Sequence, residues 1–93
     1  MTTIKSPLLC DKCQEPITII ESGNVEWISK KSQYGFHIVH DAPECRWYTY
    51  HDFMEDASLK DFLGTRRAET LASLDNADAH LIELLLTRID ASF

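Results

Sequence analysis

The chain of 93 residues is acidic: nine lysines and arginines stand against fifteen aspartates and glutamates, and the net charge is −6. This length predicts one domain over residues 1–93. The acidic balance disfavours a nucleic-acid partner, because a surface that meets phosphates is basic, and it favours a protein partner with a basic surface. No apolar stretch is long enough for a membrane helix and no signal-peptide pattern is present, so we expect a cytoplasmic protein with reduced thiols and no membrane partner.

The first motif follows a short polar beginning. Residues 1–7 lack an apolar core, so we expect them to fray. Cys10 and Cys13 are then separated by two residues. Such a pair curls into a tight knuckle in which both sulfurs face one cation. The sequence therefore predicts half of a metal site near the start of the chain.

Three short segments have the composition of β-strands. Residues 16–20 are β-branched and bounded by turn signals, residues 25–28 follow a Ser-Gly-Asn turn, and residues 36–40 come after a polar loop. Together they predict a hairpin or a three-stranded sheet that returns the chain to the knuckle. Residues 1–50 are therefore expected to form a β-rich half.

A second pair of candidate ligands follows the third predicted strand. His40 ends that strand, and Pro43 after Asp41 has the pattern of a helix start, which places Cys45 in the first helical turn. Zinc binds three thiolates and one imidazole tetrahedrally, and with four protein ligands it has no open position for water, so we expect a structural ion. Such an ion contributes on the order of 10 kcal/mol to folding. The predicted zinc ligands are Cys10, Cys13, His40 and Cys45.

The fourth ligand has two alternatives. His37 and His40 are three residues apart on one strand, so their side chains point to opposite faces and only one of them can face the knuckle. We favour His40, which lies beside the turn that precedes Cys45. His51 is the other alternative, if the segment after Cys45 turns back toward the knuckle.

Three other interpretations of the cysteines compete with zinc. A redox C-x2-C of the thioredoxin type needs a βαβ context, whereas Pro16 and a β-rich run follow the motif here. A disulfide framework cannot pair all three cysteines. Unrelated buried thiols are the third interpretation, because free cysteine is a common core residue.

The order of knuckle, hairpin and helix start around Cys10, Cys13, His40 and Cys45 resembles the treble-clef zinc domains, over about half the chain. It is also similar to the first half of a LIM module, where C-x2-C is followed by H-x2-C; the last spacing here is H-x4-C. The feature that carries over is the broader treble-clef arrangement. The resemblance implies a module that binds a protein or a nucleic acid.

Residues 46–54 are rich in aromatic side chains and fit either a strand or a helix. We expect these aromatics to pack the β-rich half against the rest of the chain. The alternative is an exposed aromatic platform for a partner.

The last part of the chain, residues 51–93, is predicted to be helical. The patterns of caps and apolar residues indicate a short helix over 58–64, a second over 66–74 and a third over 77–91. The apolar set of the third helix is wider than one stripe, so this helix belongs to the core or to half of a homodimer interface. The predicted fold is α+β, with a zinc-bound β-rich half over 1–50 followed by a bundle of about three helices.

Two sharper functions have less support than a protein-interaction module. Residues 58–74 resemble a DNA-binding helix-turn-helix, but residues 51–93 carry four basic and nine acidic side chains. Residues 40–43 have the H-x-x-P spacing of a His-finger nuclease, but the asparagine and second histidine of that family are missing from the same unit. We therefore expect a non-enzymatic zinc-binding interaction module, a regulator or inhibitor of another protein, with a DNA-binding regulator as the alternative.

Overall fold

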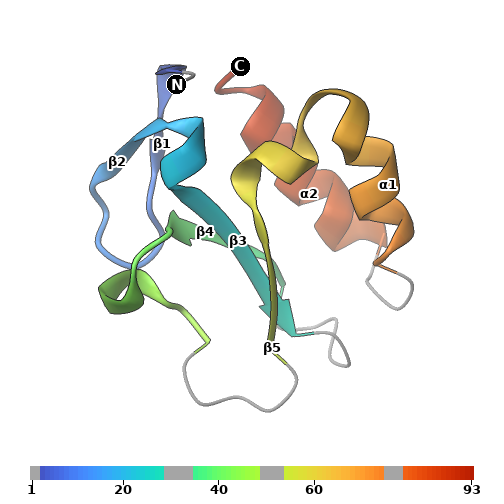
Figure 1. Ribbon diagram of the computed structural model, residues 1–93, viewed down its shortest axis with the longest axis horizontal. Helices are drawn as coiled ribbons and strands as arrows, with labels where there is room; N and C mark the ends of the chain where they lie inside the picture. Colours follow the sequence, from blue (N-terminus) through green and yellow to red (C-terminus); the bar gives the residue numbers. More distant parts are fainter. Residues whose placement is uncertain (1–2, 29–34, 49–53, 75–78) are drawn as a thin grey trace.

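The computed structural model describes residues 3–28, 35–48, 54–74 and 79–93. These residues form an α+β fold with a two-stranded sheet, a three-stranded sheet and two α-helices (Figure 1). The elements in chain order are β1 (Thr3–Leu9), β2 (Pro16–Ile19), β3 (Gly23–Ile28), β4 (His37–His40), β5 (Met54–Ser58), α1 (Arg67–Ala72) and α2 (Ala79–Asp90).

The larger sheet is built around β3. This strand pairs antiparallel with β4 on one edge and with β5 on the other, while β1 and β2 pair with each other in the smaller sheet. Because β4 pairs with residues 23–26 and β5 with residues 24–28, the middle of β3 has hydrogen-bond partners on both sides and can be buried. The register pairs Gly23 with His40, so the end of β4 lies beside the start of β3.

One buried cluster joins the two sheets and the second helix. Ile17 of β2, Ile38 of β4 and Ile89 of α2 are each almost or completely inaccessible to solvent. In Figure 1 the β1–β2 pair lies to the left of β3 and both helices lie to its right. Cys10 and Cys45 belong to the same cluster, so the predicted metal site borders the core.

The predicted bundle of about three helices is wrong. Only two α-helices form among the described residues, and α1 has just six residues. The segment expected to open the bundle instead contains strand β5, followed by two 3-10 turns at Leu59–Phe62 and Gly64–Arg66. Ser58, at the start of the helix predicted over 58–64, makes no side-chain capping hydrogen bond.

Pairing with the second edge of β3 explains why residues 54–58 form a strand instead of part of the predicted helical region. Met54–Ser58 has a composition of low β propensity, with two acidic residues and an alanine. It is extended because it supplies hydrogen-bond partners to β3, and tertiary pairing outweighs a weak local preference. Leu59 and Phe62 then turn into the core from a short 3-10 turn, and both are fully buried.

Two smaller expectations are also wrong. Residues 3–9 form β1, and Ile4 and Leu8 are buried, so the described part of the first segment is held in a sheet instead of fraying. The helix expected after Asp41 is a single 3-10 turn, Pro43–Cys45. The aromatic segment 46–54, expected to be a strand or a helix, is described only in part. Its last residue, Met54, begins β5, and residues 49–53 lie outside the described residues.

Gly23 is a position where any side chain collides with the core. A methyl group at Gly23 would lie 2.6 Å from Leu59 Cδ2 and 3.0 Å from Leu59 Cβ, and Leu59 is fully buried. We expect Gly23→Ala to lower the free energy of unfolding by about 1–3 kcal/mol, measured by urea denaturation. The same substitution in a Leu59→Ala background should cost clearly less, and equal costs in both backgrounds would contradict the collision.

The buried carboxylate of Glu26 is a second sensitive point. Glu26 is 1% exposed, and its Oε1 accepts hydrogen bonds of 3.2 Å from the backbone N–H groups of Trp47 and Tyr48. Glu26→Ala leaves two backbone donors without this acceptor, so we expect a loss of about 2–3 kcal/mol in thermal denaturation. Glu55→Ala, at an exposed position of β5, is the control and should change stability by less than about 0.5 kcal/mol. Equal losses in the two variants would refute the role of Glu26.

Candidate metal centre

The knuckle that carries Cys10 and Cys13 is a tight turn directly after β1. The N–H of Gln14 donates to the carbonyl of Cys10, and the N–H of Cys10 donates to the carbonyl of Glu15, both at 2.9 Å. Gln14 has a φ of 65°, which reverses the chain toward β2. This turn brings the two cysteine side chains to the same side of the backbone, as the C-x2-C spacing predicts.

The other two candidate ligands come from the end of β4 and the turn that follows. His40 is the last residue of β4, and Cys45 is the last residue of the 3-10 turn that begins at Pro43. The N–H of Asp11 donates to the carbonyl of Ile38 at 2.8 Å, which fixes the knuckle beside β4. The site is therefore assembled from two segments that the hydrogen bonds of the backbone hold together.

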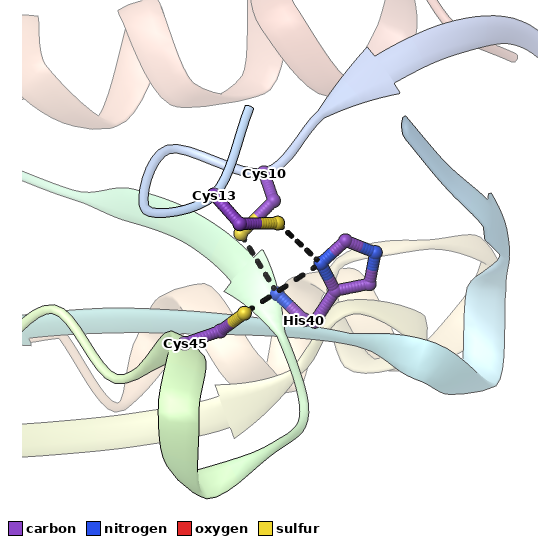
Figure 2. Close-up of side chains that lie close together, drawn as sticks. All are labelled: Cys10, Cys13, His40 and Cys45. Atoms are coloured by element: carbon purple, nitrogen blue, oxygen red, sulfur yellow. Dashed lines mark hydrogen bonds between the residues drawn. The ribbon is translucent and has the colours of Figure 1, made fainter. Parts of the chain in front are cut away.

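The structure brings the four predicted ligand residues into one cluster. One ligand atom from each of them lies within 4.8 Å of all the others. His40 Nδ1 is 3.4 Å from Cys13 Sγ and 3.8 Å from Cys45 Sγ, and the three cysteine side chains gather around this histidine (Figure 2). Tetrahedral zinc bonds of about 2.3 Å to sulfur and 2.0 Å to nitrogen separate ligand atoms by about 3.5–3.8 Å. The donor types and spacing of the cluster therefore suit a zinc ion.

The imidazole of His40 is oriented as a metal ligand requires. Its Nε2 lies 3.2 Å from the carbonyl oxygen of Pro16. Because a carbonyl only accepts hydrogen bonds, Nε2 is the donor in this contact, and Nδ1 is the ring nitrogen that faces the sulfurs. Histidines that bind metals usually donate their other ring N–H to such an acceptor.

His37 does not face the cluster. Its Nδ1 lies 3.2 Å from Asp11 Oδ2, and its ring stacks on Trp47 with centroids 4.0 Å apart. His51, the other alternative ligand, lies outside the described residues. Trp47 is 39% exposed, so it packs on His37 and is also partly open to solvent.

The thiols of Cys10 and Cys45 differ in how readily they ionise without a cation. Burial tends to raise the pKa of Cys10, but hydrogen bonds from N–H groups of the knuckle and of His40 outweigh burial and bring this pKa to about 6. Burial and the neighbouring Cys13 and Cys10 raise the pKa of Cys45 to about 12. Three sulfurs this close cannot all be anionic unless a cation offsets their repulsion, and a bound divalent metal ion would supply that charge.

Asp11 ties the knuckle to the second helix. Its carboxylate accepts hydrogen bonds from the N–H of Ile38 at 3.0 Å and from Arg88 at 3.0 and 2.7 Å. Burial raises the pKa of Asp11, but the bonds from His37, Arg88 and Ile38 outweigh it and lower the pKa to about 2. Arg88 also donates to the carbonyl of Leu9 at 2.7 Å. An ionised carboxylate thus links β1, β4 and α2 directly behind the metal site.

A cleft of about 550 Å³ opens on the outer side of the cluster. Cys13, the exposed cysteine, lies in its wall together with His40 and Cys45. The rest of the wall is rich in carboxylates, so the approach to the sulfurs is acidic. The other lining residues are Glu15, Glu21, Ser22, Asp41, Ala42 and Glu44.

The arginines of the helix-turn-helix alternative are engaged within the chain. Arg66 pairs with Asp61 at 3.1 Å, and Arg67 donates to the carbonyl of Phe62 at 2.7 Å and pairs with Asp90. α1, which begins at Arg67, is too short to lie along a DNA groove as a recognition helix does. Nothing in this region of the described chain favours DNA binding.

The residues that sequence reasoning missed are those that support the ligands. Asp11, Arg88 and the carbonyl of Pro16 position the knuckle and His40. An acidic residue inside a C-x2-C motif was the only local signal for Asp11. Arg88 carries no such signal, because it lies 77 residues from its partner.

No protein-family model matches the chain, no curated protein is significantly similar to it in sequence, and no solved structure significantly matches its fold. None of the helices in the described segments is long and apolar enough to cross a membrane.

Proposed function

We propose that Cys10, Cys13, His40 and Cys45 hold a structural zinc ion, and that this ion stabilises a small protein-interaction module. The observation that carries the proposal is the convergence of three sulfurs and one oriented imidazole within 4.8 Å. Cobalt and iron bind similar donor sets, but zinc is the usual ion in tetrahedral sites of thiolates and imidazole. The likeness to treble-clef domains is part of this proposal and rests on the knuckle and the β3–β4 hairpin.

Native mass spectrometry of the full chain tests the metal. We expect one zinc ion per chain, and we expect His40→Ala to lose it. His37→Ala is the matched control, because His37 contacts Asp11 and Trp47 rather than the sulfurs, and this variant should keep the ion. Loss of zinc from the His37 variant alone, or a folded natural chain without metal, would overturn the proposal.

We infer a binding role rather than catalysis from the closed set of ligands. A zinc ion with four protein ligands lacks the open position at which catalytic zinc activates water. The partner that the chain's charge favours is a protein with a basic surface, because the net charge is −6. Exposed carboxylates of the helical region, Glu69 on α1 and Glu83 on α2, are candidates for that contact.

Affinity capture with the zinc-loaded chain as bait tests the partner. We expect a basic protein whose capture weakens as salt is raised, because exposed charges are screened within about 8–10 Å at 0.10–0.15 M salt. A Glu69→Lys, Glu83→Lys bait should lose this partner, while a Lys12→Glu bait should keep it. Recovery of nucleic acid alone would instead favour the DNA-binding alternative.

A homodimer through α2 is a second form that this module can take. The predicted interface, residues 77–91, includes Leu84, which is 53% exposed on a helix otherwise packed through Leu85 and Ile89. The native mass spectrum that counts zinc also counts chains, so it tests the dimer directly. A dimer should dissociate in a Leu84→Glu variant, and a single chain at all concentrations would exclude it.

A further inference from the structure

The three sulfurs of the metal centre are not equally accessible. Cys10 is 0% exposed and Cys45 is 5% exposed, whereas Cys13 is exposed. Cys13 also lies in the wall of the 550 Å³ cleft, which is wide enough to admit a small molecule from solvent. One sulfur of the cluster can therefore meet a solute while at least one other, that of Cys10, is enclosed.

We propose that Cys13 is a site of reversible oxidation by peroxides, and that a disulfide between Cys13 and Cys10 then opens the metal centre. This inference rests on the proposed zinc site and concerns its regulation. A metal-bound cysteine is a thiolate, and the thiolate is the form that reacts with peroxides. Exposure then decides which thiolate reacts first, and only Cys13 combines both properties.

The chemistry balances in two steps. The Cys13 thiolate attacks one oxygen of the peroxide, the O–O bond breaks, and the products are Cys13 sulfenic acid and an alkoxide or hydroxide. The Cys10 thiolate then attacks the sulfur of that sulfenic acid, which forms the S–S bond and releases hydroxide. Two thiolates lose two electrons in total, and the peroxide gains them.

Cys10 is the favoured partner because it shares a turn with Cys13. The hydrogen bond from the N–H of Gln14 to the carbonyl of Cys10 closes that turn at 2.9 Å. Cys13 lies inside this turn, and its Sγ lies within 4.8 Å of the Sγ of Cys10, so a small movement of the two side chains brings the sulfurs to bonding distance. The bond removes two of the four ligands at once, so His40 and Cys45 alone would remain to hold the ion.

Hydrogen peroxide added to the zinc-loaded full chain tests the inference. A coloured zinc chelator reports release, and we expect one zinc ion released for each pair of thiols lost. The three cysteines fall in different tryptic peptides, residues 6–12, 13–30 and 32–46. The disulfide should join the first two of these peptides, and a thiol reductant with added zinc should restore the loaded chain. A disulfide that joins 13–30 to 32–46 would overturn the choice of partner.

Two matched variants distinguish the effect of the exposure of Cys13 from the effect of losing any one sulfur of the cluster. Cys13→His and Cys45→His each replace one sulfur by an imidazole that can still bind zinc. We expect peroxide-driven release to slow at least about tenfold in Cys13→His, because the exposed thiolate is gone, and to change little in Cys45→His. Equal slowing in both variants would refute the role of Cys13.

A measurement on the natural chain covers the case in which a variant fails to bind zinc. Brief treatment of the loaded chain with iodoacetamide, followed by tryptic mapping, should label Cys13 before Cys10 and Cys45. Simultaneous labelling of all three cysteines would contradict the inference. A chain that binds zinc but keeps it in excess peroxide refutes this inference alone, whereas a chain that binds no zinc refutes the proposed function itself.

Discussion

A Cys10→Ala variant should bind no zinc and should unfold at room temperature. Cys10 is completely buried in the core cluster, and its Sγ accepts a hydrogen bond of 3.4 Å from the N–H of His40. A structural zinc ion contributes about 10–16 kcal/mol in small zinc domains, and an ordinary domain is stable by about 5–15 kcal/mol. Loss of the ion should therefore cost about as much as the whole free energy of unfolding of such a domain.

Circular dichroism during thermal denaturation measures this effect, with and without a zinc chelator. The natural chain should lose its transition when the chelator is added, and the Cys10→Ala variant should show no transition under either condition. Val39→Ala is the control for a lost core side chain, since Val39 is fully buried in β4. It should lose about 1–3 kcal/mol but remain sensitive to the chelator. If the melting temperature of the natural chain is the same with and without the chelator, zinc has no structural role.

The convergence of the three cysteines and His40 is the part of this structure that the sequence predicts well. Cysteines two residues apart define the knuckle locally, and few other arrangements use cysteine and histidine at the ends of a hairpin. The structure places Cys10, Cys13, His40 and Cys45 together, and it directs His37 toward Asp11. This part could be predicted because the ligand types are rare and their spacing has a direct geometric meaning.

The C-terminal half could not be predicted in the same way. Met54–Ser58 forms a strand because it pairs with the second edge of β3. The local sequence of these five residues does not indicate that pairing. Leu59 and Phe62 face the core from short turns, although their spacing of three residues also suits one face of a helix. The local pattern of apolar residues therefore fits both backbones, and long-range pairing decides between them.

Asp11→Ala should weaken zinc binding about 10–100-fold and lower the free energy of unfolding by about 3–4 kcal/mol. Asp11 does not touch the ion site itself. Its carboxylate holds the knuckle against Ile38 and Arg88, and its low pKa of about 2 shows that it is ionised at neutral pH. Without it, the N–H of Ile38 and the guanidinium of Arg88 lose their acceptor, and the knuckle is no longer fixed beside β4.

Competition with a chelator of known affinity measures zinc binding, and chelator-free urea denaturation measures stability. Asp41→Ala is the matched control, because Asp41 follows the ligand His40 but its side chain is exposed, and it should change zinc affinity less than about threefold. Arg88→Met removes the other half of the ion pair from α2, so it should reproduce most of the effect of Asp11→Ala. If Arg88→Met leaves zinc affinity unchanged while Asp11→Ala lowers it, the helix does not support the metal centre, and Asp11 acts only through the backbone of β4.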